Sequence, residues 1–153
     1  MHRIKDLDGN FLGKGYDEVI IEENVDGFEV GCAVLGTDKL IIGEVDEIEL
    51  EDGFFDYFEK YNLKTSKIHL PARISKEERE RIKDTALAIY KILGCSGFAR
   101  VDMFYTKDKK IVFNEVNTIP GCTSHSRYPS MLKEIGIPFE EVIERLIELG
   151  WEK

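Results

Sequence analysis

The chain has 153 residues, about one small domain, with 42% hydrophobic residues and a formal net charge of −9. This acidity excludes a basic surface for non-specific binding of nucleic acid. No apolar run is long enough to span a membrane and the N-terminus lacks the apolar core of a signal peptide, so we expect a cytoplasmic protein with no nucleic-acid or membrane partner. Cys32, Cys95 and Cys122 are expected to be reduced thiols.

The first 25 residues are interpreted as a remnant or linker. Residues 1–17 are polar and glycine-containing, and no Lys-Ser/Thr pair follows at the spacing of a phosphate-binding loop. Residues 19–25 form a short apolar run and are predicted to be a strand. Residues 26–153 are expected to form one domain.

The next predicted elements are strands. Residues 28–35 and 40–45 are apolar runs joined by a Gly-containing turn, which predicts a meander. The acidic residues 44–52 are expected to be a strand edge and loop. Residues 54–61 carry five aromatic side chains, fit no clean helix or strand period, and are interpreted as core or packed loop.

Helices dominate the remaining predictions. Ser75 and Glu78 form a capping box, apolar residues follow at helical spacing, and Gly94 ends the helix. A short strand over 67–72 precedes it, and two helices are predicted over 128–135 and 139–149. The fold class is therefore α+β, a predominantly antiparallel sheet with two or three helices. We expect the helices on one sheet face and the functional site on the other.

Between these helices the chain predicts a β-hairpin, with strands over 98–105 and 111–116. Side chains alternate along a strand, so Arg100 and Asp102 share one face of the first strand and Glu115 and Asn117 share one face of the second. If the strands pair in the simplest register, the two carboxylates and the amide converge beside Arg100.

Two carboxylates and an amide oxygen are hard ligands suited to Mg²⁺, with Mn²⁺ as a possible substitute. Without a cation they would repel one another. The alternative is a solvated hairpin face on which charges alternate with core residues. The Gly- and Pro-containing loop over 118–126 is rich in hydroxyl groups and suits backbone N–H groups directed at an anion.

Three motifs carry a family resemblance: Arg100-x-Asp102, Asn-Glu-Val-Asn-Thr-Ile-Pro-Gly over 114–121, and Thr-Ser-His-Ser over 123–126. They resemble the ATP-grasp D-alanine–D-alanine ligases, and are most similar to the D-alanine–D-serine ligases of vancomycin resistance. The resemblance runs from about residue 19 to the C-terminus. It implies the C-terminal ATP-grasp domain of an enzyme that makes the dipeptide precursor of peptidoglycan from ATP through an acyl phosphate.

The resemblance also implies roles for the hairpin residues. Asp102, Glu115 and Asn117 match the residues that hold Mg²⁺ on the phosphates of ATP. Arg100 and the backbone N–H of Gly121 match the groups that stabilise the tetrahedral oxyanion.

Further residues match the substrate site and a mobile loop. By the resemblance, Lys60 and Ser126 bind the carboxylate of the second amino acid, and Tyr61 pins the closed loop over the site. Arg127 replaces an apolar residue common in D-alanine–D-alanine ligases, which favours D-serine over a second D-alanine.

The nucleotide site is expected near the start of the domain. Glu22, Glu23 and Val25 match the interdomain hinge whose backbone holds the adenine, and Glu29 matches the acidic residue that binds the ribose hydroxyls. Glu23 and Asn24 depart from the family pattern, in which a lysine and an apolar or aromatic residue are more frequent.

In the family, an N-terminal domain and most of the central domain precede the matched segment. We therefore expect this chain to need those domains as partners and to be inactive alone, with D-alanine and D-serine (or a second D-alanine) as substrates; a homodimer is left open. Two alternatives remain: another ATP-grasp carboxylate–amine ligase, or a non-catalytic fragment that acts as a structural or interaction module.

Overall fold

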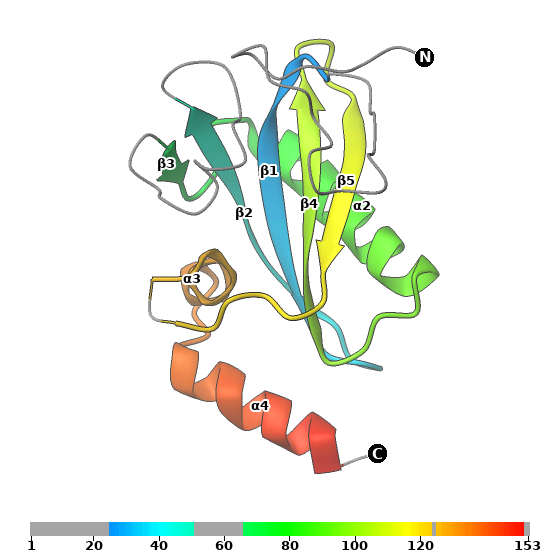
Figure 1. The fold of residues 1–153 in the computed structure, drawn as a ribbon, viewed down its shortest axis with the longest axis vertical. Coiled ribbons are helices and arrows are strands. Elements are labelled where there is room, and N and C mark those ends of the chain that lie inside the picture. The colour runs from blue at the N-terminus through cyan, green and yellow to red at the C-terminus, as the bar shows by residue number, and fades with distance from the viewer. Residues whose placement is uncertain (1–24, 51–65, 124, 152–153) are drawn as a thin grey trace, which may run out of the picture.

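The computed structural model describes residues 25–50, 66–123 and 125–151. Within them, five antiparallel strands form one sheet in the order β3-β2-β1-β4-β5 (Figure 1). The strands are β1 (Gly27–Leu35), β2 (Ile41–Leu50), β3 (Ser66–His69), β4 (Phe98–Thr106) and β5 (Ile111–Asn117); the helices are α2 (Lys76–Ile92), α3 (Arg127–Glu134) and α4 (Phe139–Trp151). The predicted α+β class is confirmed. None of these helices has both the length and the apolar character needed to cross a bilayer.

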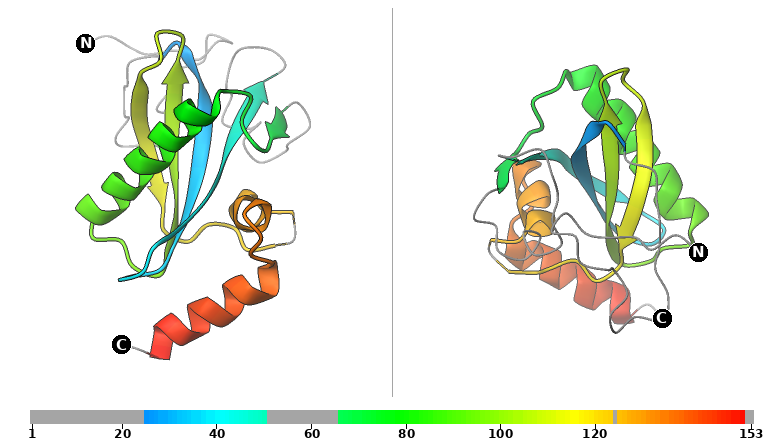
Figure 2. Two further views of the ribbon diagram at one scale, coloured as in Figure 1. Left: turned by 180° about the vertical axis from the view of Figure 1, so that it is seen from behind. Right: turned by 45° about the horizontal axis from the view of Figure 1, so that its top comes forward.

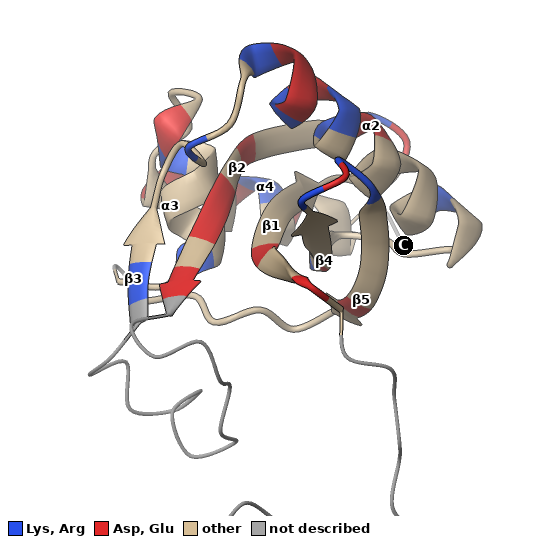
Figure 3. Cartoon of the chain, turned by 90° about the horizontal axis from the view of Figure 1, so that it is seen from above, with Lys and Arg blue, Asp and Glu red and all other residues tan. Residues whose placement is uncertain are grey.

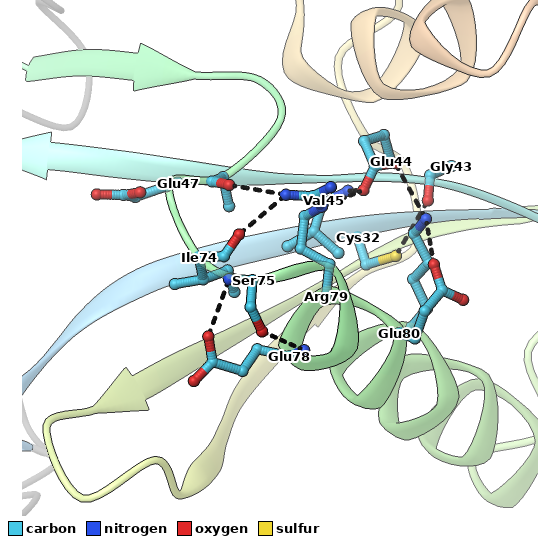
Figure 4. A network of polar contacts seen from close by, with 12 residues as sticks. Cys32, Gly43, Glu44, Val45, Glu47, Ile74, Ser75, Glu78, Arg79 and Glu80 are labelled. Atoms are coloured by element: carbon cyan, nitrogen blue, oxygen red, sulfur yellow. Dashed lines mark hydrogen bonds and ion pairs between the residues drawn. The ribbon is translucent and has the colours of Figure 1, made fainter.

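Helix α2 covers one face of the sheet (Figure 2). The predicted capping box is confirmed, because the Ser75 hydroxyl accepts from the N–H of Glu78 and the Glu78 carboxylate accepts from the N–H of Ser75. The buried face of α2 packs on alternate residues of β1 and β4; this core contains Val30, Cys32, Val34, Val45, Ala72, Ile82, Ala86, Tyr90, Ala99, Val101, Met103 and Tyr105. Glu44 on β2 pairs with Arg79 of α2 (Figure 4). It also pairs with Lys83 of the same helix, and the two ion pairs hold α2 against the sheet.

Helices α3 and α4 pack on the opposite face, at one end of the sheet. Ala33 and Leu35 of β1 meet Tyr128, Met131, Leu132 and Val142 in a second core. The Tyr128 hydroxyl also donates to the carbonyl of Val34 at 3.0 Å. The expectation that all helices share one face was therefore wrong, because β1 is apolar on both faces at this end. At the other end of the same face, polar residues replace the apolar ones.

Strand β2 is longer than predicted. The acidic stretch that was expected to include a loop continues as strand to Leu50 and pairs with both β1 and β3. Its charges are matched by neighbours: Glu47 accepts from the backbone and guanidinium of Arg73, and Glu49 lies 2.6 Å from the imidazole of His69. Because each carboxylate has a partner that donates to it, several acidic residues can lie close together on this interior strand.

Two predicted segments lie outside the described residues. They are the strand over 19–25, of which the structure describes Val25, and the aromatic segment over 54–61.

Candidate active site

One row of residues crosses four neighbouring strands of the sheet. Gly31 of β1 is paired with Asp46 of β2 on one side and with Asp102 of β4 on the other. Asp102 is in turn paired with Glu115 of β5. Acidic residues, red in Figure 3, recur along β2 and also occur on β1, β4 and β5. Because partners in a register share a face, three carboxylates lie in line on the face that α2 does not cover.

The adjacent row holds the other two hairpin residues. Arg100 is paired with Asn117, two residues along the ladder from the Asp102–Glu115 pair and on the same face, because the Val101–Val116 pair between them faces the α2 core. The predicted hairpin register is thus confirmed for these four residues, and the β-bulge that interrupts the ladder comes only after Asp102. The side-chain oxygen of Asn117 accepts from the N–H of Ile119 at 3.1 Å, which fixes its orientation at the start of the following loop.

Arg100 holds Asp102 in a two-pronged ion pair. Its Nε lies 2.8 Å from Oδ1 and 3.0 Å from Oδ2 of Asp102, and its Nη2 lies 2.8 Å from Oδ2. The Asp102 side chain is 1% exposed and that of Arg100 is 15% exposed. Asp102 is therefore a buried carboxylate whose charge is matched by the neighbour two residues earlier on its own strand.

Arg127 joins three strands through their carboxylates. Its Nε and Nη2 donate to the two oxygens of Asp46 at 2.7 and 2.8 Å, and its Nη1 donates to Glu29 at 2.9 Å. Its Nη2 also lies 3.5 Å from Oδ1 of Asp102. We call Glu29, Asp46, Asp102 and Arg127 the Arg127 cluster. It ties the first turn of α3 to β1, β2 and β4 at once.

The carboxylates of this cluster stabilise the charged form of the buried Arg127 side chain. Burial by itself lowers the pKa of the guanidinium, but the hydrogen bonds and charge of Asp46, followed by the charges of Asp102 and Glu29, outweigh burial and raise the pKa above its ordinary value. Arg127 is a permanent cation held inside the cluster.

Gly31 provides the space for the Arg127 cluster. A Cβ atom at this position would lie 2.5 Å from Nη2 of Arg127, 2.8 Å from Oδ1 of Asp46 and 3.0 Å from Oδ1 of Asp102. The N–H of Gly31 donates to Oδ1 of Asp46 at 3.0 Å. The missing side chain lets a guanidinium lie directly over the strand, the close approach for which glycine is suited in strands.

The loop between β5 and α3 folds around Ser126. The Ser126 hydroxyl accepts from the N–H of Thr123 at 3.0 Å and lies 2.9 Å from the Thr123 hydroxyl. A Cβ atom added to Gly121 would lie 3.0 Å from the Ser126 hydroxyl oxygen, so Gly121 and Ser126 are close neighbours. Gly121, predicted to bind the oxyanion, and Ser126, predicted to bind the substrate carboxylate, are thus neighbours in the same loop.

The predicted nucleotide and loop residues are described only in part. Val25 borders a hollow of about 550 Å³ together with the residues of the β4–β5 turn. Glu29, the predicted ribose ligand, is 6% exposed and contacts Arg127. Glu22, Glu23, Lys60 and Tyr61 lie outside the described residues, so their roles stay predictions.

Asp46 and Gly31 are site residues that the sequence analysis missed. Asp46 belongs to the acidic stretch that was expected to be a strand edge and loop, yet its side chain is 1% exposed. A signal for Gly31 was present: it is a glycine inside the apolar run of β1, the pattern that marks a close backbone approach. Nothing local distinguishes Asp46 from the other acidic residues of β2.

The donor atoms of the hairpin fit a hard divalent cation. Asp102 and Glu115 provide carboxylates, Asn117 provides an amide oxygen, and all three side chains share one face of the hairpin. No group of three or more His, Cys, Asp or Glu side chains in the described ranges forms a self-sufficient metal centre. A site of two carboxylates completed by water and substrate phosphates suits Mg²⁺.

Comparison with protein families matches residues 12–148 to the model described as "D-ala D-ala ligase C-terminus". Among curated proteins, the vancomycin/teicoplanin A-type resistance protein VanA of Enterococcus faecium is 51% identical over 141 residues, which cover 88% of this chain and 41% of VanA. This and four other curated relatives are covered over 39–43% of their length. The chain therefore spans about two fifths of the length of each.

Two solved structures share the fold. The VanG D-Ala:D-Ser ligase from Enterococcus faecalis superposes with a TM-score of 0.75 at 66% identity, over 83% of this chain and 37% of that one. A D-alanine–D-alanine ligase from Bacillus anthracis, complexed with ATP, superposes with a TM-score of 0.69 at 31% identity, over 86% of this chain and 42% of that one.

Proposed function

The chain belongs to the family of the D-alanine–D-alanine ligase C-terminus, and from this premise we propose that it forms the acyl-transfer half of an ATP- and Mg²⁺-dependent D-alanine–D-serine ligase. The observation that carries the proposal is the pairing of Asp102 with Glu115 and of Arg100 with Asn117 on one sheet face. A structural module has no need for two carboxylates, an amide and an arginine on one face of a hairpin beside a polar loop.

We assign the cation to the hairpin. Asp102, Glu115 and Asn117 would hold Mg²⁺, which supplies positive charge to the phosphates of ATP during phosphoryl transfer. Transfer of the γ-phosphoryl group to the carboxylate of D-alanine gives an acyl phosphate. The amine of the second amino acid then attacks this acyl phosphate, and phosphate leaves.

Arg100 and the following loop would act on the charge that develops during this attack. The guanidinium of Arg100 comes from the same face as the metal ligands, and the N–H of Gly121 comes from the loop after β5. Two donors that approach from different elements can enclose an oxyanion, whose stabilisation accounts for a large part of catalysis in acyl transfer. Ser126, next to Gly121, would bind the carboxylate of the second substrate.

The preference for D-serine rests on the polar character of the site near Ser126. Arg127 follows Ser126 directly and contacts Asp46 and Glu29, so ionic groups occupy the region beside the second-substrate site. A hydroxyl group on the substrate gains hydrogen-bond partners in such a region, whereas the methyl group of D-alanine does not. The similarity to a D-Ala:D-Ser ligase at 66% identity supports the same choice.

A chimeric enzyme tests this function. This chain would replace the matching C-terminal segment of the VanG ligase, and dipeptides formed from ATP, D-alanine and D-serine would be separated and quantified. We expect more D-alanyl-D-serine than D-alanyl-D-alanine, and no ligation by the isolated chain. Arg100→Ala should lower kcat by about 10²–10³, the usual effect of losing one preorganised charge contact.

The matched control is Arg145→Ala, which removes an arginine from the ion pair of α4 with Glu141. It should leave the rate of ligation unchanged. A folded chimera that forms no dipeptide, or one that keeps its rate with Asp102→Asn, would refute the proposed function. Equal yields of both dipeptides would refute only the preference for D-serine.

A further inference from the structure

Arg100 occupies both oxygens of the carboxylate that is assigned to the metal. Three contacts of 2.8–3.0 Å join its guanidinium to Asp102. Within the described part of the chain, every hydrogen bond donated by the Arg100 side chain goes to Asp102. A carboxylate keeps further lone pairs beside a bidentate guanidinium, but a divalent cation on either oxygen would lie next to the positive charge of Arg100. The two cations repel one another at that distance, so they compete for Asp102.

The second arginine near Asp102 differs in this respect. Arg127 approaches Oδ1 of Asp102 at 3.5 Å, but its stronger contacts are the 2.7 and 2.8 Å bonds to Asp46 and the 2.9 Å bond to Glu29. It would remain in place if Asp102 changed partner. Of the two guanidiniums, only that of Arg100 depends on Asp102 for its position.

We propose that Arg100 is the counter-ion of Asp102 before metal binding and that the divalent cation takes its place, which frees the guanidinium to face the reacting anion. This inference rests on the metal assignment of the proposed function. The exchange keeps Asp102 neutralised throughout, because a buried carboxylate is costly without a partner. It also orders the events: Arg100 becomes available for substrate only when the metal is bound.

The first experiment follows the Arg Nε–H groups by ¹⁵N NMR in the whole chain, with signals identified from Arg100→Lys, Arg127→Lys and Arg145→Lys. Mg²⁺ alone is added to millimolar concentration. We expect the exchange of the Arg100 Nε proton with water to accelerate at least about tenfold, since its charge-assisted bond is lost. The Nε protons of Arg127, bonded to Asp46, and of Arg145, bonded to Glu141, should keep their rates and serve as internal controls.

The second experiment measures Mn²⁺ binding by water-proton relaxation. Arg100→Ala should bind Mn²⁺ about tenfold more tightly than the unmodified chain, because no charge-assisted bond has to be broken. Arg100→Lys keeps the positive charge but loses the planar, two-pronged geometry of the guanidinium. The exchange therefore predicts a Mn²⁺ affinity between those of Arg100→Ala and the unmodified chain. An effect of net charge alone predicts the same affinity as in the unmodified chain. Asp102→Asn should abolish binding, and Arg145→Ala should leave it unchanged.

The outcomes separate the two ideas. If metal binding is lost in Asp102→Asn but the Arg100 Nε proton still exchanges slowly with water when Mg²⁺ is present, the proposed exchange is wrong. The assignment of the metal to Asp102 would then stand. Binding that is the same in Asp102→Asn, or that is undetectable both in the unmodified chain and in Arg100→Ala, would overturn the metal assignment and the exchange together. Binding that is detected only in Arg100→Ala supports the exchange, because the arginine then outcompetes the free cation.

Discussion

The guanidinium of Arg127, in the first turn of α3, donates from Nε and Nη2 to the two carboxylate oxygens of Asp46 on β2, 81 residues earlier in the chain. The side chains are 12% and 1% exposed. This pair fixes the start of α3, and with it the loop that holds Ser126 and Gly121, against the sheet face that carries Asp102 and Glu115. Together with the second core and the Tyr128–Val34 hydrogen bond, it keeps this loop in place relative to the hairpin.

Replacement of Asp46 by alanine should lower the free energy of unfolding by about 3–5 kcal/mol, the usual cost of removing one partner from a buried ion pair. Urea unfolding followed by circular dichroism measures this change. Glu141→Ala is the matched control, because it breaks the more exposed pair with Arg145 within α4. That change should cost less than about 0.5 kcal/mol. Similar losses for both variants would contradict the structural role of Asp46.

Gly31→Ala should destabilise the protein by about 1–3 kcal/mol, because the added methyl group overlaps Arg127 and Asp46 and forces them apart. Gly150→Ala is the control, for which we expect a change in stability of opposite sign. Gly150 lies in α4, and a Cβ there meets no atom within 4 Å, so the substitution should stabilise the helix by about 0.5–1 kcal/mol. Thermal unfolding should shift the two variants in opposite directions. If Gly31→Ala left the thermal stability unchanged or raised it, the Arg127 cluster would have space for a methyl group at this position.

The capping glutamate of α2 should make stability sensitive to acid. The hydroxyl of Tyr105, then the backbone of Ser75 and the ammonium of Lys109, lower the pKa of Glu78 from 4.5 to about 2. A carboxyl group with a lowered pKa in the folded state contributes stability above its unfolded value, and this contribution is lost as the pH falls through the folded value. The stabilisation by Glu78 is therefore complete above about pH 4.5 and disappears towards pH 2.

Unfolding free energies measured across this range should show a shallower pH dependence in Glu78→Gln than in the unmodified chain. Tyr105→Phe should have a smaller effect in the same direction, since it removes only the hydroxyl that donates to Glu78 at 2.7 Å. Parallel pH profiles for Glu78→Gln and the unmodified chain would refute the assignment.

Ser126→Ala should loosen the loop that precedes α3. The N–H of Thr123 loses its acceptor at 3.0 Å, so its hydrogen exchange should accelerate by about fivefold, the effect of one ordinary hydrogen bond of roughly 1 kcal/mol. Amide exchange measured by NMR checks this. Ser130→Ala is the control, because its hydroxyl donates to the carbonyl of Ser126 and not to Thr123. Unchanged exchange at Thr123 would mean that other contacts hold the loop.

Local sequence signals determined the elements whose stabilising contacts are close in the chain. The capping box of Ser75 and Glu78 and the helical spacing behind it located α2, because each contact spans only a few residues. The hairpin faces followed equally from strand alternation across a short turn. Arg100, Asp102, Glu115 and Asn117 could therefore be placed together from sequence alone.

Only the tertiary structure decided which charges of the first half of the chain belong to the site. Asp46 looks like any other carboxylate of the acidic stretch, and its partner Arg127 lies 81 residues away. Glu29 reaches the same guanidinium across 98 residues. The pairing of β1 with both β2 and β4, and the docking of α3 on that sheet, bring these groups into contact. Such long-range contacts depend on the packing of the whole domain, which no local pattern encodes.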